Sequence, residues 1–167
     1  MNSTPPLQTT RLDLEPVRSG HAQEAWPQFD DERMWRYFPS ARPSTVDDLR
    51  ERYERWERGS PHADQVWRNW LCRDRASGAA IGVVQATIFP QEAASHIAYA
   101  IFSVHQRNGY AREAAQAVID YVKGSYGVER FFAEMDTRNE ASYRLAESLG
   151  FVRVETRIDE YLYELTV

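Results

Sequence analysis

The segment from Gln106 to Ala111, QRNGYA, has residue types suited to holding an anion in front of a helix. A helix N-terminus presents free N–H groups and the positive end of the helix dipole, so phosphate groups bind there when the backbone can come close. Gly109 would permit that approach, and Arg107 and Arg112 would add positive charge at the rim. The segment lacks the Gly-Lys-Ser/Thr and GxGxxG patterns of nucleotide-binding loops. An ordinary strand-to-helix turn stays open as the alternative, because a single glycine before a helix is common.

Few other side chains point to chemistry by their type and spacing alone. Cys72 is the only cysteine, which excludes an intramolecular disulfide and a cysteine-based metal cluster. We expect it to be an inert thiol in a strand, since a reactive cysteine needs an electropositive setting. The four histidines show no metal-ligand spacing, so we expect no metal.

Hydrophobic periodicity predicts the elements that would position the loop. We expect strands at 11–17 (a short edge strand), 66–73, 80–89, 95–102, 130–135, 151–155 and 161–167. We expect helices after a Ser19 cap, after a capping box of Ser44 and Asp47, at 111–122, and within 139–150, where Gly150 would close the helix. This order predicts an α+β domain around one mixed sheet.

Composition limits the class of protein. The 167 residues fit one domain, 1–167, and 43% hydrophobic with 27% charged residues is a globular composition. A net charge of −5 argues against a nucleic-acid binder and is compatible with a cationic substrate. The first residues do not read as a signal peptide and no apolar run has transmembrane length, so we expect no membrane partner and a cytoplasmic location.

Two motifs together carry a family resemblance. YAIFSVHQRNGYAREA is followed further along the chain by NEASYRLAESLGF. This pair resembles the GNAT superfamily of acyl-CoA N-acyltransferases, and most of all its RimJ/RimL-like branch. The resemblance covers nearly the whole chain, with TTRLDLEPV similar to the opening strand and GAAIGVVQ similar to the central hairpin. It implies a GNAT-like fold with a central mixed, mostly antiparallel sheet flanked by about four helices.

The resemblance also implies a site for acetyl-CoA (coenzyme A) as cosubstrate, without a metal. Backbone amides from Gln106 to Ala111 would bind the pyrophosphate. The strand from Tyr99 to Ile101 would pair with the pantetheine arm where it separates from the strand that contains FFAEM. The implied cofactor-binding residues are Tyr99, Ala100, Ile101, Gln106, Arg107, Asn108, Gly109, Tyr110, Ala111, Arg112, Asn139 and Ser142.

Acyl transfer from a thioester to an amine needs an unprotonated amine, donors for the oxyanion and a leaving thiolate. His96 stands where the branch often carries a glutamate, and an imidazole with a reference pKa of about 6.5 can accept a proton. The alternative is a solvent-facing strand histidine. Many family members carry a tyrosine acid where this chain has Ala146, which leaves Ser142 as the candidate acid. Its hydroxyl could instead bond to its own helix backbone.

Trp35, Tyr37 and Phe38 could line an acceptor cleft or belong to the core. The resemblance predicts an N-acetyltransferase that moves an acetyl group to a primary amine, on a protein N-terminus or a small molecule, by direct attack in a ternary complex. The alternative is a non-catalytic coenzyme A-binding module with a regulatory or interaction role. The sequence selects neither the acceptor nor the assembly, for which a homodimer is one option.

Overall fold

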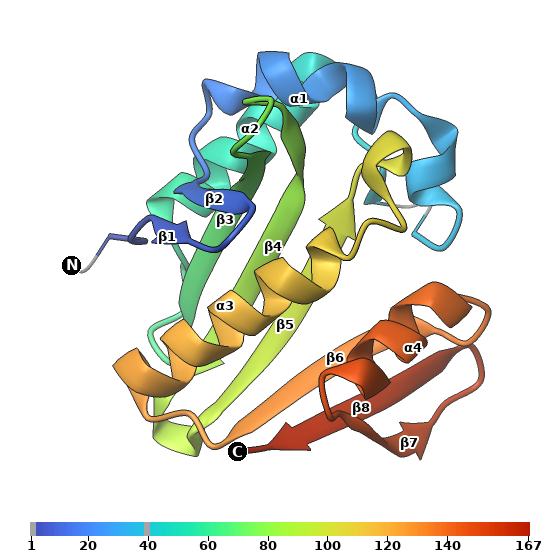
Figure 1. Ribbon diagram of the computed structural model, residues 1–167. Coiled ribbons are helices and arrows are strands. Elements are labelled where there is room, and N and C mark those ends of the chain that lie inside the picture. The colour runs from blue at the N-terminus through green and yellow to red at the C-terminus, as the bar shows by residue number, and fades with distance from the viewer. Residues whose placement is uncertain (1–2, 39–40) are drawn as a thin grey trace.

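The computed structural model describes residues 3–38 and 41–167 and is built around one eight-stranded sheet (Figure 1). The strands are β1 (Leu7–Gln8), β2 (Leu12–Pro16), β3 (Val66–Asp74), β4 (Ala80–Phe89), β5 (Ala94–Ile101), β6 (Arg130–Asp136), β7 (Val152–Thr156) and β8 (Glu160–Thr166). Their order across the sheet is β1-β2-β3-β4-β5-β6-β8-β7. Neighbouring strands run antiparallel except β5 and β6, so the expected mixed, mostly antiparallel sheet is confirmed.

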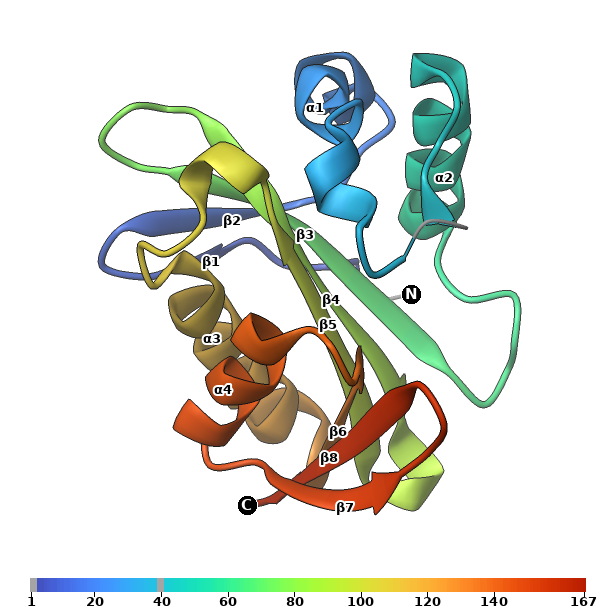
Figure 2. The same cartoon turned by 90° about the vertical axis from the view of Figure 1, so that its right-hand side faces the viewer.

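Four α-helices cover the two faces of the sheet. They are α1 (His21–Phe29), α2 (Val46–Arg58), α3 (Tyr110–Tyr126) and α4 (Glu140–Ser148), with short 3-10 turns η1 (Glu32–Trp35), η3 (Pro90–Glu92) and η4 (Ser103–His105). Figure 2 shows α1 and α2 on one side of the sheet and α3 and α4 on the other. The expected number of helices and the α+β architecture are both confirmed.

Helix α3 carries an apolar stripe that holds it against the sheet. Ala114, Ala115, Val118, Ile119 and Val122 are buried along it, at the spacing that puts them on one helix face. The two adjacent alanines leave room for the helix backbone to lie close to the central strands. The first residues of α3 are thereby fixed relative to the end of β5.

Two expectations about capping were wrong. The capping box of α2 consists of Thr45 and Asp48 and not of Ser44 and Asp47: Thr45 Oγ1 accepts from the Asp48 N–H at 3.1 Å, and an Asp48 carboxylate oxygen accepts from the Thr45 N–H at 2.8 Å. Adjacent Ser-Thr and Asp-Asp pairs fit the same motif in two registers, so the sequence is ambiguous there. Ser19 makes no side-chain cap for α1, whose N-cap is Gly20.

Two expected boundaries also differ. The strand predicted at 11–17 is not an edge, because Leu7 and Gln8 pair with Leu14 and Asp13 on its outer side. That two-residue strand is too short to give a periodic signal. Helix α3 runs beyond 122 to Tyr126, and Gly127 ends it with a left-handed φ of 64°.

Strands β5 and β6 pair only at their beginnings. The paired residues are Ala94 with Arg130, Ser95 with Phe131 and His96 with Phe132. Beyond His96, β5 continues along β4 alone, so the expected separation of these two strands is confirmed. The separation leaves one edge of β5 without a strand partner next to the start of α3.

Candidate active site

The loop after η4 uses its own side chains to hold its shape. Gln106 Nε2 donates to the carbonyl oxygen of Ile101 at 2.9 Å, which ties the loop back to the end of β5. Asn108 Nδ2 donates to the carbonyl oxygens of His105 and Gln106, both at 3.1 Å. The side chains of Gln106 and Asn108 therefore shape the loop, and a contribution of Asn108 to a ligand would come from its backbone N–H.

The backbone N–H groups of this loop differ in their partners: that of Gln106, which was also expected to bind the pyrophosphate, donates to the Ser103 carbonyl oxygen at 3.4 Å. Arg107 and Gly109 both have left-handed φ angles, of 64° and 78°. Within the part of the chain that the structure describes, the N–H groups of residues 107–112 donate no hydrogen bond. The first bond of α3 runs from the Glu113 N–H to the Gly109 carbonyl at 3.2 Å. A row of unpaired N–H groups at the positive end of a helix is a setting that binds anions.

The two arginines predicted at the rim of this loop differ in their contacts. Arg107 is exposed in the loop itself. The Arg112 guanidinium turns toward α4, where Nη2 donates to the carbonyl oxygen of Ser148 at 3.4 Å. Ala111 is half-buried in the first turn of α3. Of the two arginines, Arg107 is therefore the one whose side chain lies at the loop without a contact to α4 in the described structure.

Sequence reasoning missed Arg11, which reaches the loop from the turn between β1 and β2. Its Nε donates to Glu113 Oε2 at 2.7 Å, its Nη1 donates to the carbonyl oxygen of Asn108 at 2.8 Å, and its guanidinium lies 4.6 Å from the centre of the Tyr110 ring. Burial raises the pKa of Glu113, but hydrogen bonds from Thr9 and Arg11 outweigh it and lower the pKa below its usual value. Nothing in the spacing of the sequence indicates a contact between residues this far apart.

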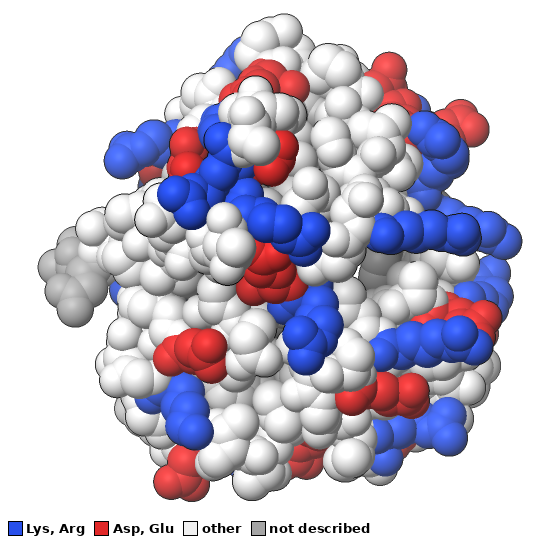
Figure 3. Space-filling view, viewed as in Figure 1, with Lys and Arg blue, Asp and Glu red and all other residues white. Residues whose placement is uncertain are grey.

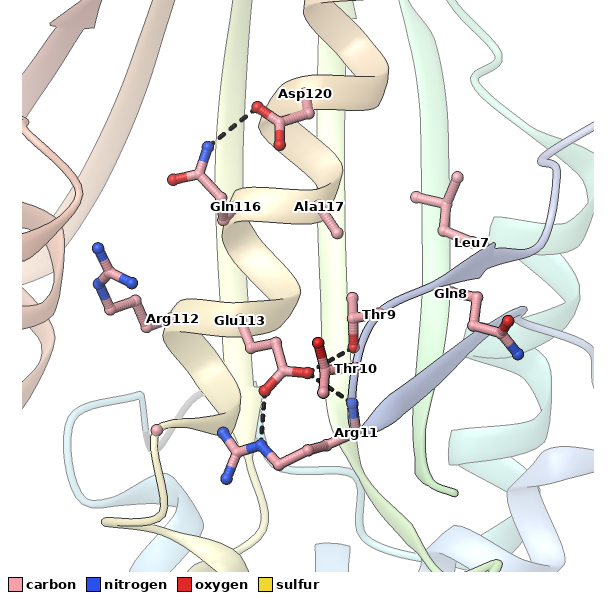
Figure 4. A pocket seen from close by; sticks show the side chains of 11 residues that line it. Leu7, Gln8, Thr9, Thr10, Arg11, Arg112, Glu113, Gln116, Ala117 and Asp120 are labelled. Carbon is pink, nitrogen blue, oxygen red and sulfur yellow. Dashed lines mark hydrogen bonds and ion pairs between the residues drawn. The ribbon is translucent and has the colours of Figure 1, made fainter. Parts of the chain in front are cut away.

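These contacts border a groove of about 710 Å³ between the β1–β2 turn and α3 (Figure 4). The groove lies on the β1–β2 side of α3, whereas the unpaired edge of β5 faces toward β6 and α4 (Figure 1). It is open and lined by mixed polar and apolar side chains. The groove is therefore separate from the unpaired strand edge, although Gly109 and Arg112 of the predicted cofactor site line it.

The unpaired edge of β5 contains three predicted site residues. Tyr99, Ala100 and Ile101 pair with β4 on one side and, among the described residues, have no strand partner on the other. On β4, Gly82 lies opposite Ile101, and a side chain there would come within 2.9 Å of the Ile101 Cα atom. The glycine lets β5 lie close to β4 while β6 diverges. An extended ligand with amide groups could pair with this edge as an added strand.

Tyr99 and Ser142 meet across the gap between β5 and α4. The Tyr99 hydroxyl donates to the Ser142 carbonyl oxygen at 3.1 Å, and Ser142 Oγ donates to the Tyr99 hydroxyl oxygen at 3.3 Å. Asn139 caps α4, because its Oδ1 accepts from the Ser142 N–H at 3.2 Å. Burial raises the pKa of Tyr99, and the Ser142 hydrogen bond partly offsets this. Three predicted site residues are thus together, and the Ser142 hydroxyl bonds to Tyr99 rather than to its own helix backbone.

Ala146, at the position where the resemblance led us to look for a tyrosine acid, faces the core. Ala146 is 1% exposed and packs in the main hydrophobic cluster. The ring of Tyr143 packs against Tyr161 with 5.8 Å between ring centres. Ser142 is therefore the helix residue whose hydroxyl reaches across to β5.

His96 lies on the other face of the sheet from Tyr99, because the two residues are three positions apart in a regular strand. Its ring lies between those of Phe89 and Phe132, with centre distances of 5.8 and 5.4 Å. Ala98 lies on the same face as His96, two residues further toward the separation of β5 and β6. It is exposed although β5 is a central strand. The structure does not bring His96 to Ser142. It places the two candidate proton-transfer residues on opposite faces.

The aromatic segment after α1 packs on the His96 face of the sheet, the face that α1 and α2 cover. Trp35 belongs to that packing, since its Nε1 donates to the Phe29 carbonyl oxygen at 2.7 Å. Tyr37 is half-buried and Phe38 is 47% exposed. The structure therefore leaves Tyr37 and Phe38 accessible and gives Trp35 a structural position.

Tyr37 of the same segment lies near Arg138, just before α4. Hydrogen bonds with Asp136 raise the pKa of Arg138, and a smaller contribution comes from Tyr37, which lies nearby. Hydrogen bonds from Arg33 lower the pKa of Asp31 to about 2.

Other candidates for chemistry give no second site. Cys72 is buried, and burial raises the pKa of its thiol to about 12, so it is inert. Among the residues described, no cluster of three or more His, Cys, Asp and Glu side chains could hold a metal ion. No described helix is long and apolar enough to cross a membrane. Figure 3 shows acidic and basic side chains interspersed over the face that carries α3, with basic ones most numerous on the side of α4.

Comparisons with known sequences relate this chain to acetyltransferases. A family model described as an acetyltransferase (GNAT) domain matches residues 11–152. A Bacillus subtilis (strain 168) protein named as the uncharacterized N-acetyltransferase YoaA is 26% identical over 161 residues, which are 96% of this chain and 89% of the relative.

Comparisons with solved structures agree on the fold. A GNAT-family acetyltransferase from Bacillus anthracis matches with a TM-score of 0.81 and 21% identity, over 97% of this chain and 98% of the other. The ribosomal-protein-S5-alanine acetyltransferase from Vibrio fischeri matches with a TM-score of 0.79 and 21% identity, over 97% and 96%. The expected GNAT-like fold is confirmed.

Proposed function

This chain belongs to the acetyltransferase (GNAT) family, and on that premise we propose that it transfers an acetyl group from acetyl-CoA to a primary amine by direct attack in a ternary complex. The observation that carries the proposal is the row of unpaired N–H groups at residues 107–112 beside the unpaired edge of β5. A diphosphate and a chain of amides are the two chemical features of coenzyme A that would satisfy these groups.

The binding roles follow from the backbone. The N–H groups of residues 107–112 would hold the diphosphate, and the edge from Tyr99 to Ile101 would pair with the amides of the pantetheine arm. Acetyl-CoA supplies the thioester that is broken in the reaction. No covalent intermediate on the protein is needed, in keeping with the buried, inert thiol of Cys72.

Ser142 and Tyr99 would act on the leaving thiolate. A thiol with a reference pKa of about 8.5 leaves readily near neutral pH, so one hydrogen bond to the developing charge is sufficient help. Ser142 Oγ, which now donates to the Tyr99 hydroxyl, would turn its proton toward the sulfur. Tyr99 would keep the serine backbone in place through its bond to the Ser142 carbonyl oxygen.

His96 would act on the amine from the opposite face of β5. A primary alkyl amine has a pKa of about 10.4 and is mostly protonated at neutral pH, so a base or a water relay must take its proton. Because Ala98 is exposed, the path from His96 to the separation of β5 and β6 is open on the face of the sheet that carries His96. Tyr37 and Phe38 would then line the approach of the acceptor.

The acceptor we propose is the amino group of a peptide N-terminus or of a small molecule. A structural relative is named for acetylating an alanine of a ribosomal protein, which makes peptide N-termini the first class to test. A coenzyme A-binding module without transferase activity is the less favoured alternative, because the matching sequence relative is named as an N-acetyltransferase.

An acetyl-CoA consumption assay over peptides, polyamines and aminoglycosides tests the proposal. We expect stoichiometric release of free thiol and acetylated product with at least one acceptor class. Coenzyme A binding by calorimetry without turnover on any acceptor would favour the non-catalytic module. A folded protein that binds no coenzyme A would contradict both.

A further inference from the structure

Arg11 is the one side chain from the β1–β2 turn that contacts the backbone of residues 106–112 in the described structure. We propose that Arg11 is a positioning residue that sets the shape of this loop for a diphosphate. The inference rests on the proposed function, because the diphosphate in question is that of coenzyme A.

The geometry of the peptide group carries the argument. In a planar trans peptide, the carbonyl of one residue and the N–H of the next point in opposite directions. Arg11 Nη1 donates to the Asn108 carbonyl oxygen at 2.8 Å, which directs the Gly109 N–H away from Arg11. The Glu113 N–H donates to the Gly109 carbonyl oxygen at 3.2 Å, and the Tyr110 N–H therefore points away from Glu113, out of the start of the helix. Arg11 thus fixes the Asn108 carbonyl, and with it the direction of the Gly109 N–H in front of α3.

Glu113 links Arg11 to the helix that the loop begins. It accepts from Arg11 twice, at 2.8 Å from the backbone N–H to Oε1 and at 2.7 Å from Nε to Oε2. Thr9 Oγ1 adds a third bond to Oε1, at 2.6 Å. Figure 4 shows Arg11, Thr9 and Glu113 converging beside the first turn of α3. Because the carboxylate compensates the charge of Arg11, the effect on the loop is one of geometry more than of charge.

Two further contacts confine Arg11 to this position. Its guanidinium lies 4.6 Å from the centre of the Tyr110 ring, a cation–π arrangement. Its Nη2 lies 3.4 Å from the point that a Cβ atom on Gly109 would occupy. A lysine ammonium lacks the planar fork by which the Nε and Nη1 donors of Arg11 reach Glu113 and Asn108 in one fixed geometry.

The test compares coenzyme A with pantetheine, which lacks the diphosphate. Dissociation constants for both are measured by titration on wild-type protein, Arg11→Met and the control Arg75→Met. Arg75 anchors the same turn through the carbonyls of Thr9 and Thr10, at 3.0 and 3.2 Å, but has no contact with the loop. We expect Arg11→Met to weaken coenzyme A binding by about 10- to 100-fold and to change pantetheine binding less than about twofold. Arg75→Met should leave both affinities near wild type.

The outcomes separate this inference from the proposed function. Wild-type protein that binds no coenzyme A would contradict both. If wild-type protein binds coenzyme A, two results with Arg11→Met would overturn the role of Arg11 alone. One is an equal loss of affinity for coenzyme A and pantetheine, and the other is no loss of affinity for either. Arg11→Lys restores charge without the fork, so recovery of full affinity in that variant would show an effect of charge and also overturn the inference. Circular dichroism shows whether each variant is folded.

Discussion

Among single residues, the pair of Tyr99 and Ser142 connects the strand edge to the helix that follows β6. We expect Ser142→Ala to lower kcat by about 10- to 100-fold, the cost of one hydrogen bond to a charged group. The KM for acetyl-CoA should change much less, because the bond to sulfur gains strength mainly in the transition state. Steady-state kinetics with an identified acceptor measure this. An unchanged kcat would mean that the thiolate leaves unaided or takes its proton from water.

His96 lies on the other face of the sheet, and its prediction concerns the amine. If it accepts the proton, His96→Ala should lower the rate by about 10²- to 10⁴-fold while coenzyme A still binds. The acid limb of the pH–rate profile should flatten or shift. Rates and profiles of the two proteins, together with a binding titration, decide the matter. A variant with wild-type rate and profile would make His96 a packing residue between Phe89 and Phe132.

The sequence was informative about residues whose role depends on near neighbours. The free N–H groups of the loop follow from Gly109 before an amphipathic helix, a pattern present in QRNGYA, whereas the positive φ of Arg107 was not predicted. The role of Arg11 depends on Glu113, a partner far along the chain, and no local pattern signals it. The orientation of Ser142 toward Tyr99 likewise required the helix to be placed against the strand.

On the scale of elements, β5 and β4 lie in close contact at Gly82, along the part of β5 that no longer pairs with β6. A side chain at position 82 would meet the backbone of Ala100 and Ile101, so Gly82→Ala should push β5 away from β4. We expect it to lower the free energy of unfolding by about 1–3 kcal/mol in urea titrations, the usual cost of overpacking.

Gly124→Ala is the matched control for that change. Gly124 lies inside α3, and a side chain there would meet no atom within 4 Å. This control should raise the free energy of unfolding by about 0.5–1 kcal/mol, because alanine is the better helix former. Equal stability of Gly82→Ala and wild type would contradict the tight contact between the two strands.

The long elements could be predicted from the sequence and the short ones could not. Strands such as β4 and β5 have long apolar patterns bounded by turn residues, and their positions were found nearly as expected. The two residues of β1 have no periodicity of their own and form a strand only because β2 is present to pair with them. The register of the α2 cap was missed since two registers satisfy the same motif.

Across the whole molecule, an ion-pair network joins the N-terminal strands to α1. Arg73 Nε bonds to Glu15 at 3.0 Å and its Nη1 bonds to Glu24 at 2.6 Å. The hydrogen bond from Arg73 lowers the pKa of Glu24. A carboxyl group with a lowered pKa in the folded state stabilises the fold above its unfolded pKa, and this stabilisation is lost as the pH falls through the folded value.

We therefore expect the free energy of unfolding to fall as the pH drops below the ordinary glutamate pKa of about 4.3. Urea titrations between pH 7 and pH 3 measure the slope. Arg73→Met should be less stable at pH 7 and show a weaker dependence on pH over this range. The same slope in Arg73→Met and wild type would exclude this network as a source of the acid sensitivity.

The central claim is that the N–H groups in front of α3 bind the diphosphate of coenzyme A, and calorimetric titration of coenzyme A into Gly109→Val tests it most directly. Gly109 and Gly127 flank the two ends of α3 with left-handed φ angles of 78° and 64°, so Gly127→Val is a control with comparable backbone strain. We predict a loss of affinity of about 10²- to 10⁴-fold for Gly109→Val, from two broken charge-assisted hydrogen bonds, and near wild-type affinity for Gly127→Val. A folded Gly109→Val protein that binds coenzyme A as tightly as wild type would contradict the account.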